Sequence, residues 1–171
     1  MNFVKNCKTS PAQTKSPTLL PKEVRQTKPL PLEQEAFANL QRTAALLMQG
    51  VEARLGCEGI TPTQYNILRI LRGAGPSGIR CGEIAARLVT QVPDVTRLLD
   101  RLYRRRLLDR LRIQNDRRVV LVCITPEGLR LLKALDAPVL ELQQEYFRRL
   151  TRPQIAAFNS MCVQLREETR E

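Results

Sequence analysis

The sequence predicts a mainly α-helical fold with a small β-hairpin. Apolar residues recur at helical spacing before residue 60 and again after residue 126, and these two segments enclose a distinct central region. In that region, residues 81–125, a short helix and a strongly basic helix precede two strand-like runs joined by a polar turn. This order is the layout of a winged helix-turn-helix, whose hairpin is called the wing. We therefore expect a winged helix-turn-helix flanked by N- and C-terminal helices.

The length and composition predict one folded domain behind a tail. The 171 residues suffice for a single domain with appendages. Residues 1–30 contain four prolines and six basic residues against one acidic residue, which is typical of a disordered segment. We expect residues 1–30 to be a disordered basic tail and residues 31–171 to form the domain. The tail either adds loose electrostatic contacts to a polyanion or is an inert leader.

The formal net charge of +11 comes from two segments. The tail contributes +5, and residues 75–125, with eleven basic and five acidic residues, contribute +6. This distribution suits a polyanion partner, because neutralised phosphates release counterions and supply much of the non-specific affinity for nucleic acids. A solvated basic surface is the usual explanation of a single charged run. Here, however, the excess coincides with the helix-turn-helix pattern.

Capping patterns mark the starts of the helices outside the basic segment. Thr61 and Thr151 each precede a helix with a glutamine three positions on, which forms a capping box. Thr125 caps a long helix, which Pro138 is expected to kink or interrupt because its ring removes one backbone hydrogen bond. The apolar positions expected to face inward along the three flanking helices are Ala36, Leu40, Leu47, Val51 and Leu55, then Leu129, Leu132 and Leu135, then Ile155, Phe158, Cys162 and Leu165.

The basic helix begins near Pro93 and has two contrasting faces. A recognition helix needs early residues that meet base edges and later arginines that follow phosphates. An exposed amphipathic helix with ordinary surface arginines is the alternative. Arg105 and Arg106 extend the charge past the last full turn. The apolar face consists of Val95, Leu98, Leu99 and Leu102. The polar face consists of Asp94, Arg97, Arg101 and Arg104.

The hairpin is predicted from alternation. Residues 110–113 alternate arginine with an apolar residue, residues 114–117 are polar turn material, and residues 119–124 are β-branched and apolar. Two strands around a basic tip form a wing. A basic helix followed by a wing points to double-stranded DNA, with the helix in the major groove and the wing at the neighbouring minor groove.

Other functional classes find no support in the sequence. The chain has no histidine, which excludes Ser-His-Asp and Cys-His mechanisms, and we expect no enzyme. Its five cysteines are irregularly spaced without a Cys-x-x-Cys pair, so we expect neither a metal site nor a cofactor. No apolar run approaches the roughly 18 residues of a spanning helix, and no secretory signal is recognisable. A cytoplasmic location is the natural expectation.

Three motifs together closely resemble the MarR family of bacterial regulators. They are the run Pro-Asp-Val-Thr-Arg-Leu-Leu-Asp-Arg-Leu at residues 93–102, the wing motif Asp116-Arg117-Arg118, and Ile-Thr-Pro-Glu-Gly at residues 124–128. The order of helices from about residue 31 also matches. The resemblance implies a homodimeric transcriptional regulator that binds a pseudo-palindromic DNA operator, by default as a repressor. It also implies dimerisation helices within residues 31–58 and 126–171 around a winged helix-turn-helix at residues 60–125.

The resemblance also implies roles for individual residues. In the wing, the residue matching Arg118 enters the minor groove and the one matching Asp116 braces it, with Arg117 beside them. Asp94 either accepts a hydrogen bond from a cytosine amino group or caps its helix, and capping is the preferred interpretation. The residues expected at the groove-facing side of the recognition helix are Gln91, Pro93, Asp94, Thr96, Arg97 and Arg101.

Control by a small-molecule effector is a further expectation from the resemblance. Many relatives bind small, often aromatic or anionic molecules between the dimer helices and the winged helix. The candidates to line such a pocket are Phe37, Leu40, Tyr65 and Leu68, for which ordinary core packing is the alternative. Cys57 and Cys81 are candidate oxidant sensors, although free cysteines are most often small buried hydrophobes.

Besides a sequence-specific regulator, two other functions are compatible with the sequence. The first is a non-specific architectural DNA-binding protein that uses the basic wings and tail without base contacts. The second is a protein–protein adaptor built on a winged helix, but an adaptor would not need the basic face.

Overall fold

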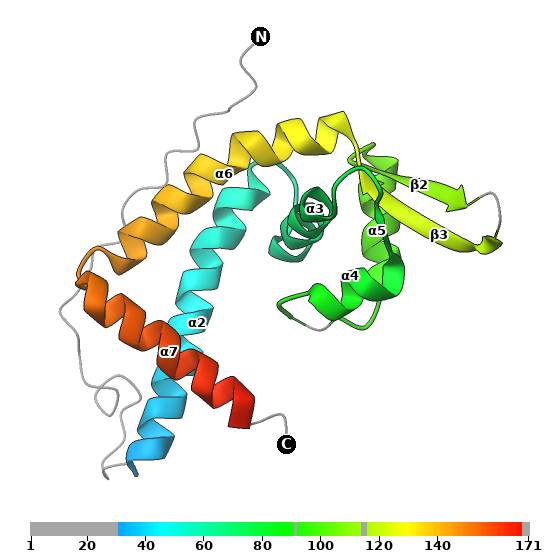
Figure 1. The fold of residues 1–171 in the computed structure, drawn as a ribbon. Coiled ribbons are helices and arrows are strands. Elements are labelled where there is room, and N and C mark those ends of the chain that lie inside the picture. Colours follow the sequence, from blue (N-terminus) through cyan, green and yellow to red (C-terminus); the bar gives the residue numbers. More distant parts are fainter. Residues whose placement is uncertain (1–30, 91, 114–115, 169–171) are drawn as a thin grey trace.

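The structure is a computed structural model that describes residues 31–90, 92–113 and 116–168. The chain forms a lobe and a helical arm that extends from it (Figure 1). The arm contains α2 (Leu32–Gly56), α6 (Pro126–Phe147) and α7 (Arg152–Glu168), and the lobe contains α3 (Pro62–Ala74), β1 (Ile79–Arg80), α4 (Cys81–Arg87), α5 (Val95–Arg104), β2 (Leu108–Ile113) and β3 (Asp116–Ile124). This mainly helical architecture with one small sheet confirms the predicted fold class.

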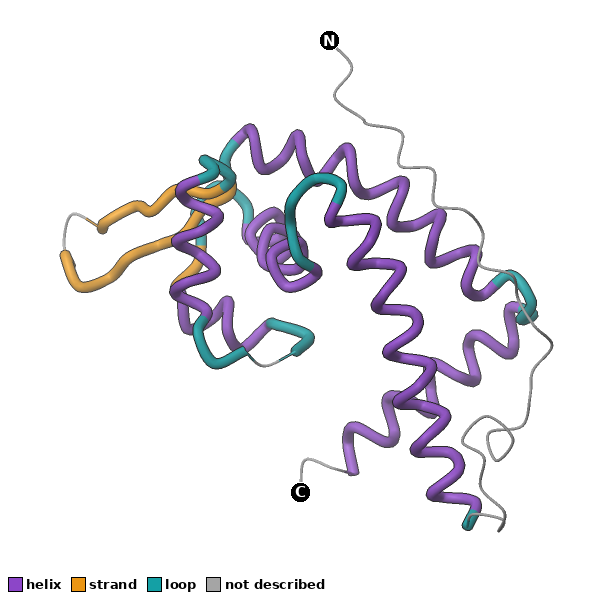
Figure 2. The backbone as a smooth tube through the Cα atoms, turned by 180° about the vertical axis from the view of Figure 1, so that it is seen from behind, coloured by secondary structure: helices purple, strands orange, loops and turns teal. Residues whose placement is uncertain are grey.

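Helices α2 and α6 extend from the lobe to the same side (Figure 2). The Tyr146 hydroxyl of α6 donates a hydrogen bond to the Leu47 carbonyl of α2 at 3.2 Å. Gly50 makes this approach possible, because a Cβ at that position would overlap the Tyr146 hydroxyl oxygen. The lobe is therefore joined to an arm whose two long helices contact each other.

The junction between α2 and α3 is a tight turn with a predicted cap. Gly59 adopts a left-handed φ of 66°, and the Ile60 N–H donates to the Leu55 carbonyl at 3.3 Å, which closes the end of α2. The capping box at the start of α3 is confirmed in both directions, because the Thr61 and Gln64 side chains each accept the other's backbone N–H.

The three strands form an antiparallel sheet in the order β1-β3-β2. β1 pairs with β3 through Ile79 opposite Val122, and β2 pairs with β3 through Leu111 opposite Leu121. The register is irregular between Arg112 and Ile113, near the tip of the hairpin. Strand β3 begins at Asp116, three residues before the β-branched run that predicted it.

One hydrophobic core joins the lobe to the base of the arm. It includes Leu55 of α2, the inner faces of α3 and α5, Val122 of β3 and Leu132 of α6. On the inner face of α3, Tyr65, Leu68 and Leu71 are all buried.

Helix α6 starts at a tightly packed cap. The Thr125 hydroxyl oxygen accepts the Gly128 N–H at 3.0 Å and donates to the Arg106 carbonyl at 2.7 Å. Gly128 needs the absence of a side chain, because a Cβ would overlap the Leu107 carbonyl oxygen. The helix continues through Pro138 to Phe147, so of the predicted kink or interruption at Pro138 the interruption does not occur.

Several apolar residues that the periodicity placed inside are exposed. Phe158 and Leu165 of α7 are 39% and 55% exposed, and Leu129 of α6 and Leu111 of β2 are also exposed. Helical spacing identifies an apolar face, but it does not say whether the same chain covers that face.

Among the described residues, the structure contains no helix of the length and apolarity that crossing a membrane requires.

Candidate nucleic-acid interface

Helix α5 is capped by the carboxylate of Asp94, the residue before its first turn. Oδ1 of Asp94 accepts the backbone N–H of Arg97 at 2.9 Å, and Oδ2 lies 3.0 Å from the Arg97 Nε. The preferred capping role of Asp94 is confirmed. Because both carboxylate oxygens already have partners, a hydrogen bond from a cytosine amino group would compete with the cap.

The two faces of α5 differ in burial as the spacing predicts. The apolar face lies in or against the core. The Arg97 side chain is 81% exposed, and its exposed ion pair with Asp94 is weak enough to open when a stronger anion approaches. The exposed positions of α5 and of the residues before it include Pro93, Thr96, Arg97, Arg101 and Arg104. This face can therefore present several hydrogen-bond donors to one surface.

Arg110 fixes β2 to α5. Its Nη2 lies 2.5 Å from Oδ1 of Asp100, and its guanidinium carbon lies 5.7 Å from the centre of the Tyr103 ring. Both partners belong to α5, so a charge-assisted hydrogen bond and a cation–π contact join the hairpin to the basic helix. The base of the wing and α5 are thereby held in one orientation.

The end of α5 is closed by a Schellman motif. The Leu107 N–H donates to the Leu102 carbonyl at 3.0 Å, and the Arg106 N–H donates to the Tyr103 carbonyl at 2.8 Å. Arg106 occupies the left-handed position of this motif with a φ of 57°, where glycine is favoured. The Thr125 hydroxyl then binds the Arg106 carbonyl, which ties the end of α5 to the start of α6.

Arg105 does not extend the DNA-facing charge as the sequence suggested. Its Nη1 and Nη2 donate hydrogen bonds to the carbonyl oxygens of Gly59 and Glu58 at 2.5 and 2.9 Å. The side chain therefore lies against the turn between α2 and α3. No local pattern marks this role, because the two acceptors lie 46 and 47 positions earlier in the chain.

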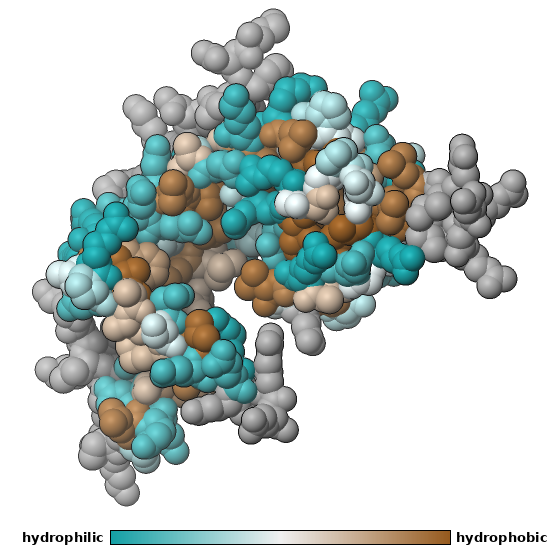
Figure 3. Space-filling model, in the orientation of Figure 1, coloured by the Kyte–Doolittle hydropathy of each residue, from teal (hydrophilic) through white to brown (hydrophobic). Residues whose placement is uncertain are grey.

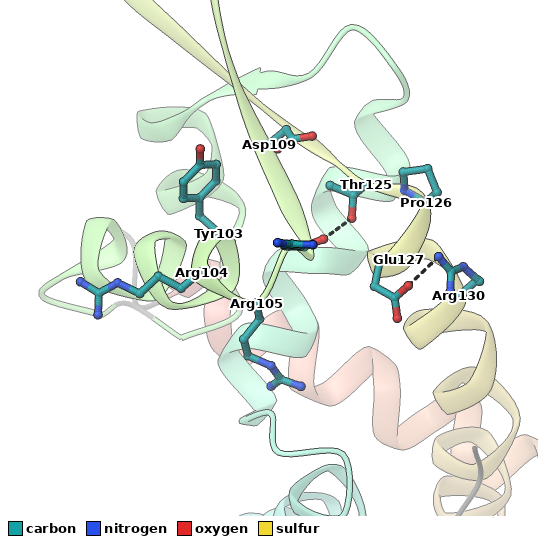
Figure 4. A pocket seen from close by; sticks show the side chains of 9 residues that line it. Tyr103, Arg104, Arg105, Asp109, Thr125, Pro126, Glu127 and Arg130 are labelled. Atoms are coloured by element: carbon teal, nitrogen blue, oxygen red, sulfur yellow. Dashed lines mark hydrogen bonds and ion pairs between the residues drawn. The ribbon is translucent and has the colours of Figure 1, made fainter. Parts of the chain in front are cut away.

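A basic hollow of about 990 Å³ lies between the end of α5 and the start of α6. Figure 4 shows that the side chains around it diverge: Arg104 and Arg105 extend in different directions, and Arg130 is paired with Glu127. The arginines do not converge on one point, as a specific anion site would require. We assign no ligand to this hollow.

Four of the predicted contact residues cannot be located in detail. Gln91 lies outside the described residues. The residues Asp116, Arg117 and Arg118 lie at the start of β3, and only their backbone is described. Their proposed contacts with DNA stay predictions.

The four residues suggested for an effector pocket are divided between two environments. Tyr65 and Leu68 of α3 are buried in the core, whereas Phe37 and Leu40 of α2 are exposed. The basic hollow at the end of α5 is lined by none of them. Their joint role as a pocket stays a prediction.

Tyr65 instead belongs to a polar contact between the lobe and the arm. Its hydroxyl donates to Oδ1 of Asp136 at 3.3 Å, and Arg72 forms an ion pair with Oδ2 of the same carboxylate at 2.5 Å. Burial raises the pKa of the Tyr65 hydroxyl, and the charge of Asp136 raises that pKa further. This network joins α3 to α6.

A second hollow of about 560 Å³ lies where α2 meets the lobe. It is lined by Met48, Glu52 and Gly56 of α2, by residues 60–63, and by Thr90 in the turn after α4. Figure 3 shows the corresponding hollow in the molecular surface between arm and lobe. The hollow is open to solvent, and its lining mixes apolar, hydroxyl and carboxylate groups.

Comparison with known proteins identifies the family to which this geometry belongs. A sequence model described as MarR family matches residues 60–120, which span the lobe from the start of α3 into β3. The multiple antibiotic resistance protein MarR of Salmonella typhimurium is 36% identical over 107 residues, which cover 62% of this chain and 73% of the relative. The chain belongs to the MarR family.

Two solved structures of this family resemble the chain over most of its length. A mutant of MarR from E. coli in complex with operator DNA has a TM-score of 0.64 and 27% identity, and the match covers 85% of this chain and 97% of that one. The PcaV regulator from Streptomyces coelicolor, in complex with its natural ligand, has a TM-score of 0.65 and 25% identity over 82% and 98% of the two chains. The chain is therefore a MarR-family transcriptional regulator and not an enzyme.

Proposed function

We propose that this MarR-family protein is a homodimeric, sequence-specific DNA-binding repressor whose operator complex is released by a small-molecule effector. The exposed arginine-bearing face of α5 carries this proposal. The face is fully formed in the single chain: its opposite side is buried, its start is capped by Asp94, and its end is closed by the Schellman motif. The E. coli relative bound to operator DNA supports a DNA partner.

In the proposed complex, α5 enters the major groove and the wing lies at the adjacent minor groove. Arg97 is the residue best placed for base contacts, because it lies in the first turn of α5 and its side chain is exposed. Asp94 holds the first turn in shape. Arg118, braced by Asp116 and flanked by Arg117, is proposed to enter the minor groove. The remaining contacts proposed for the start of the helix are Gln91, Pro93, Thr96 and Arg101.

Exposed apolar residues of the arm support the dimer. They lie on α2 and α7, where the single chain leaves large apolar side chains in water, and three of them, Leu40, Phe158 and Leu165, occupy positions where the helical period predicts burial. A second copy of the chain would cover them and place two lobes side by side, as a pseudo-palindromic operator requires. We propose dimerisation through residues 31–58 and 126–171 around a winged helix-turn-helix at residues 60–125. The exposed residues include Leu32, Phe37, Leu40, Leu46, Phe158, Met161 and Leu165.

The hollow between α2 and the lobe supports the effector. A molecule bound there would contact Glu52 on the arm and Thr90 in the turn that precedes α5. Such a molecule would prefer one relative orientation of arm and lobe, and an effector acts only through such a difference in affinity. Because the proposed partner is chromosomal DNA, we place the protein in the cytoplasm.

The proposal is tested by selecting duplexes from a random-sequence pool with the purified wild-type protein. We expect a pseudo-palindromic site to be recovered, bound by two copies of the chain, and preferred over random DNA by about 10³ or more. A protein that binds all duplexes alike would be the architectural DNA-binding protein instead. Recovery of a site that binds a single copy would refute the dimer and leave the DNA contact standing.

Repression is tested separately with a reporter gene placed behind the recovered site. The wild-type protein should lower reporter expression, and Arg97→Ala should restore it at equal protein level. Increased expression with the wild-type protein would identify an activator.

A further inference from the structure

One side chain connects the end of α5 to the arm. The residues that contact DNA in the proposed function all lie in the lobe, whereas the distance between two lobes is set by the arms. Any side chain that fixes α5 relative to the start of the arm therefore influences which operators fit. Arg105 is the side chain at this position.

The backbone around Arg105 is held on both sides. Its own N–H donates to the Arg101 carbonyl at 3.3 Å, and the next residue, Arg106, has the left-handed conformation that ends the helix. This geometry directs the Arg105 side chain away from the exposed arginine face and toward α2.

The acceptors of Arg105 belong to the turn that ends α2. The guanidinium donates to the carbonyl oxygens of Glu58 and Gly59, while the Gly59 and Ile60 N–H groups are bonded back into the last turn of α2. A cation at the carbonyl end of a helix is electrostatically favourable, and the planar guanidinium engages two acceptors at once. Arg105 thus connects the end of α5 to the end of α2.

We propose that Arg105 is a positioning residue that fixes the recognition helix against the α2–α3 turn and thereby restricts the half-site spacing that the dimer accepts. The claim about half-site spacing rests on the proposed function. Arg105 touches no base or phosphate in this account. Its effect on DNA binding passes through the orientation of α5 and, through Arg110, of the wing that is attached to it.

The first test uses the full-length protein without DNA. Hydrogen exchange is followed by mass spectrometry in wild type, Arg105→Met, Arg105→Lys and the matched control Arg104→Met. Arg104 carries the same charge one position earlier, and the structure gives it no hydrogen bond or ion pair with a described residue. In Arg105→Met, exchange in residues 56–61 should rise about threefold or more, since local opening of the turn becomes easier. Lysine should restore part of the protection, and Arg104→Met should exchange like the wild type.

The second test measures spacing with three duplexes. The probes are the site recovered by the wild-type protein and two derivatives with one base pair inserted or removed at its centre. Arg105→Met should lower the preference for the parent duplex by about threefold to thirtyfold, a range typical of residues that modulate coupling. The dependence of affinity on salt should not change, because no phosphate contact is lost. Arg104→Met should weaken all three duplexes equally and keep the spacing preference.

Several results would overturn the inference. If hydrogen exchange in residues 56–61 is the same in Arg105→Met as in the wild type, the contact of Arg105 with the α2–α3 turn is refuted. If exchange becomes faster but the spacing preference does not change, the positioning role is refuted. A salt slope reduced by about one, with equal losses on all duplexes, would make Arg105 a phosphate contact. If the wild-type protein recovers no site, both the proposed function and the spacing claim fail. The exchange experiment still tests whether Arg105 contacts the α2–α3 turn. Should Arg105→Met not fold, Arg105→Gln, which retains one amide donor group, takes its place in both tests.

Discussion

Replacing Thr125 with valine should destabilise the protein substantially. Valine keeps the shape and β-branching of threonine but removes the hydroxyl that binds both the Gly128 N–H and the Arg106 carbonyl. The loss of a helix cap costs about 1 kcal/mol. A buried N–H or carbonyl left without a partner adds a similar amount or more, about 1–2 kcal/mol. Because Thr125 is only 9% exposed, water does not replace these partners easily.

We therefore expect Thr125→Val to lower the free energy of unfolding by about 2–3 kcal/mol, or the Tm by about 6–9 °C for a chain of this size. Urea and thermal unfolding followed by circular dichroism measure both quantities, with all variants at one protein concentration because the proposed dimerisation would make the apparent stability depend on concentration. Thr125→Ser retains the hydroxyl and is the matched control. The reasoning is refuted if valine costs less than about 0.5 kcal/mol, or if serine is as damaging as valine.

Three further variants address the ends of the helix α5 and the contact between lobe and arm. Arg106→Gly should be more stable than Arg106→Ala by about 1 kcal/mol in urea unfolding, since only glycine relieves the φ of 57°; equal stabilities would contradict this. Asp94→Ala should cost about 1 kcal/mol, whereas Asp94→Asn, also a good cap, should cost less. The raised pKa of Tyr65 means that the unfolded chain ionises first as the pH rises above 10, so the stability advantage of wild type over Tyr65→Phe should shrink there.

Local signals predicted the elements of this fold well. Thr61 and Thr125 were identified as caps because capping depends on residues three positions apart, and the structure confirms both. The two faces of α5 followed from helical periodicity for the same reason. Pro138 was overestimated as a breaker, since packing on both sides of a proline can keep a long helix continuous.

Long-range contacts of the site could not be predicted from the sequence. Arg105 and Arg106 are adjacent and chemically identical, yet one binds the α2–α3 turn and the other occupies a left-handed helix end. Their difference arises from the Schellman geometry and from acceptors far away in the chain. The exposure of Phe158 likewise depends on what covers α7, which a spacing pattern cannot specify.

The central claim is that the exposed face of α5 discriminates between DNA sequences through Arg97. The most direct test is the ratio of the Kd for random duplex to the Kd for the recovered site, measured for wild type, Arg97→Ala and the control Lys133→Ala at an exposed position of α6. A base contact by arginine provides about 1–3 kcal/mol of discrimination, so Arg97→Ala should lower the ratio about 5- to 150-fold. Lys133→Ala should leave it unchanged. If Arg97→Ala weakens both duplexes by the same factor and preserves the ratio, α5 does not select the sequence.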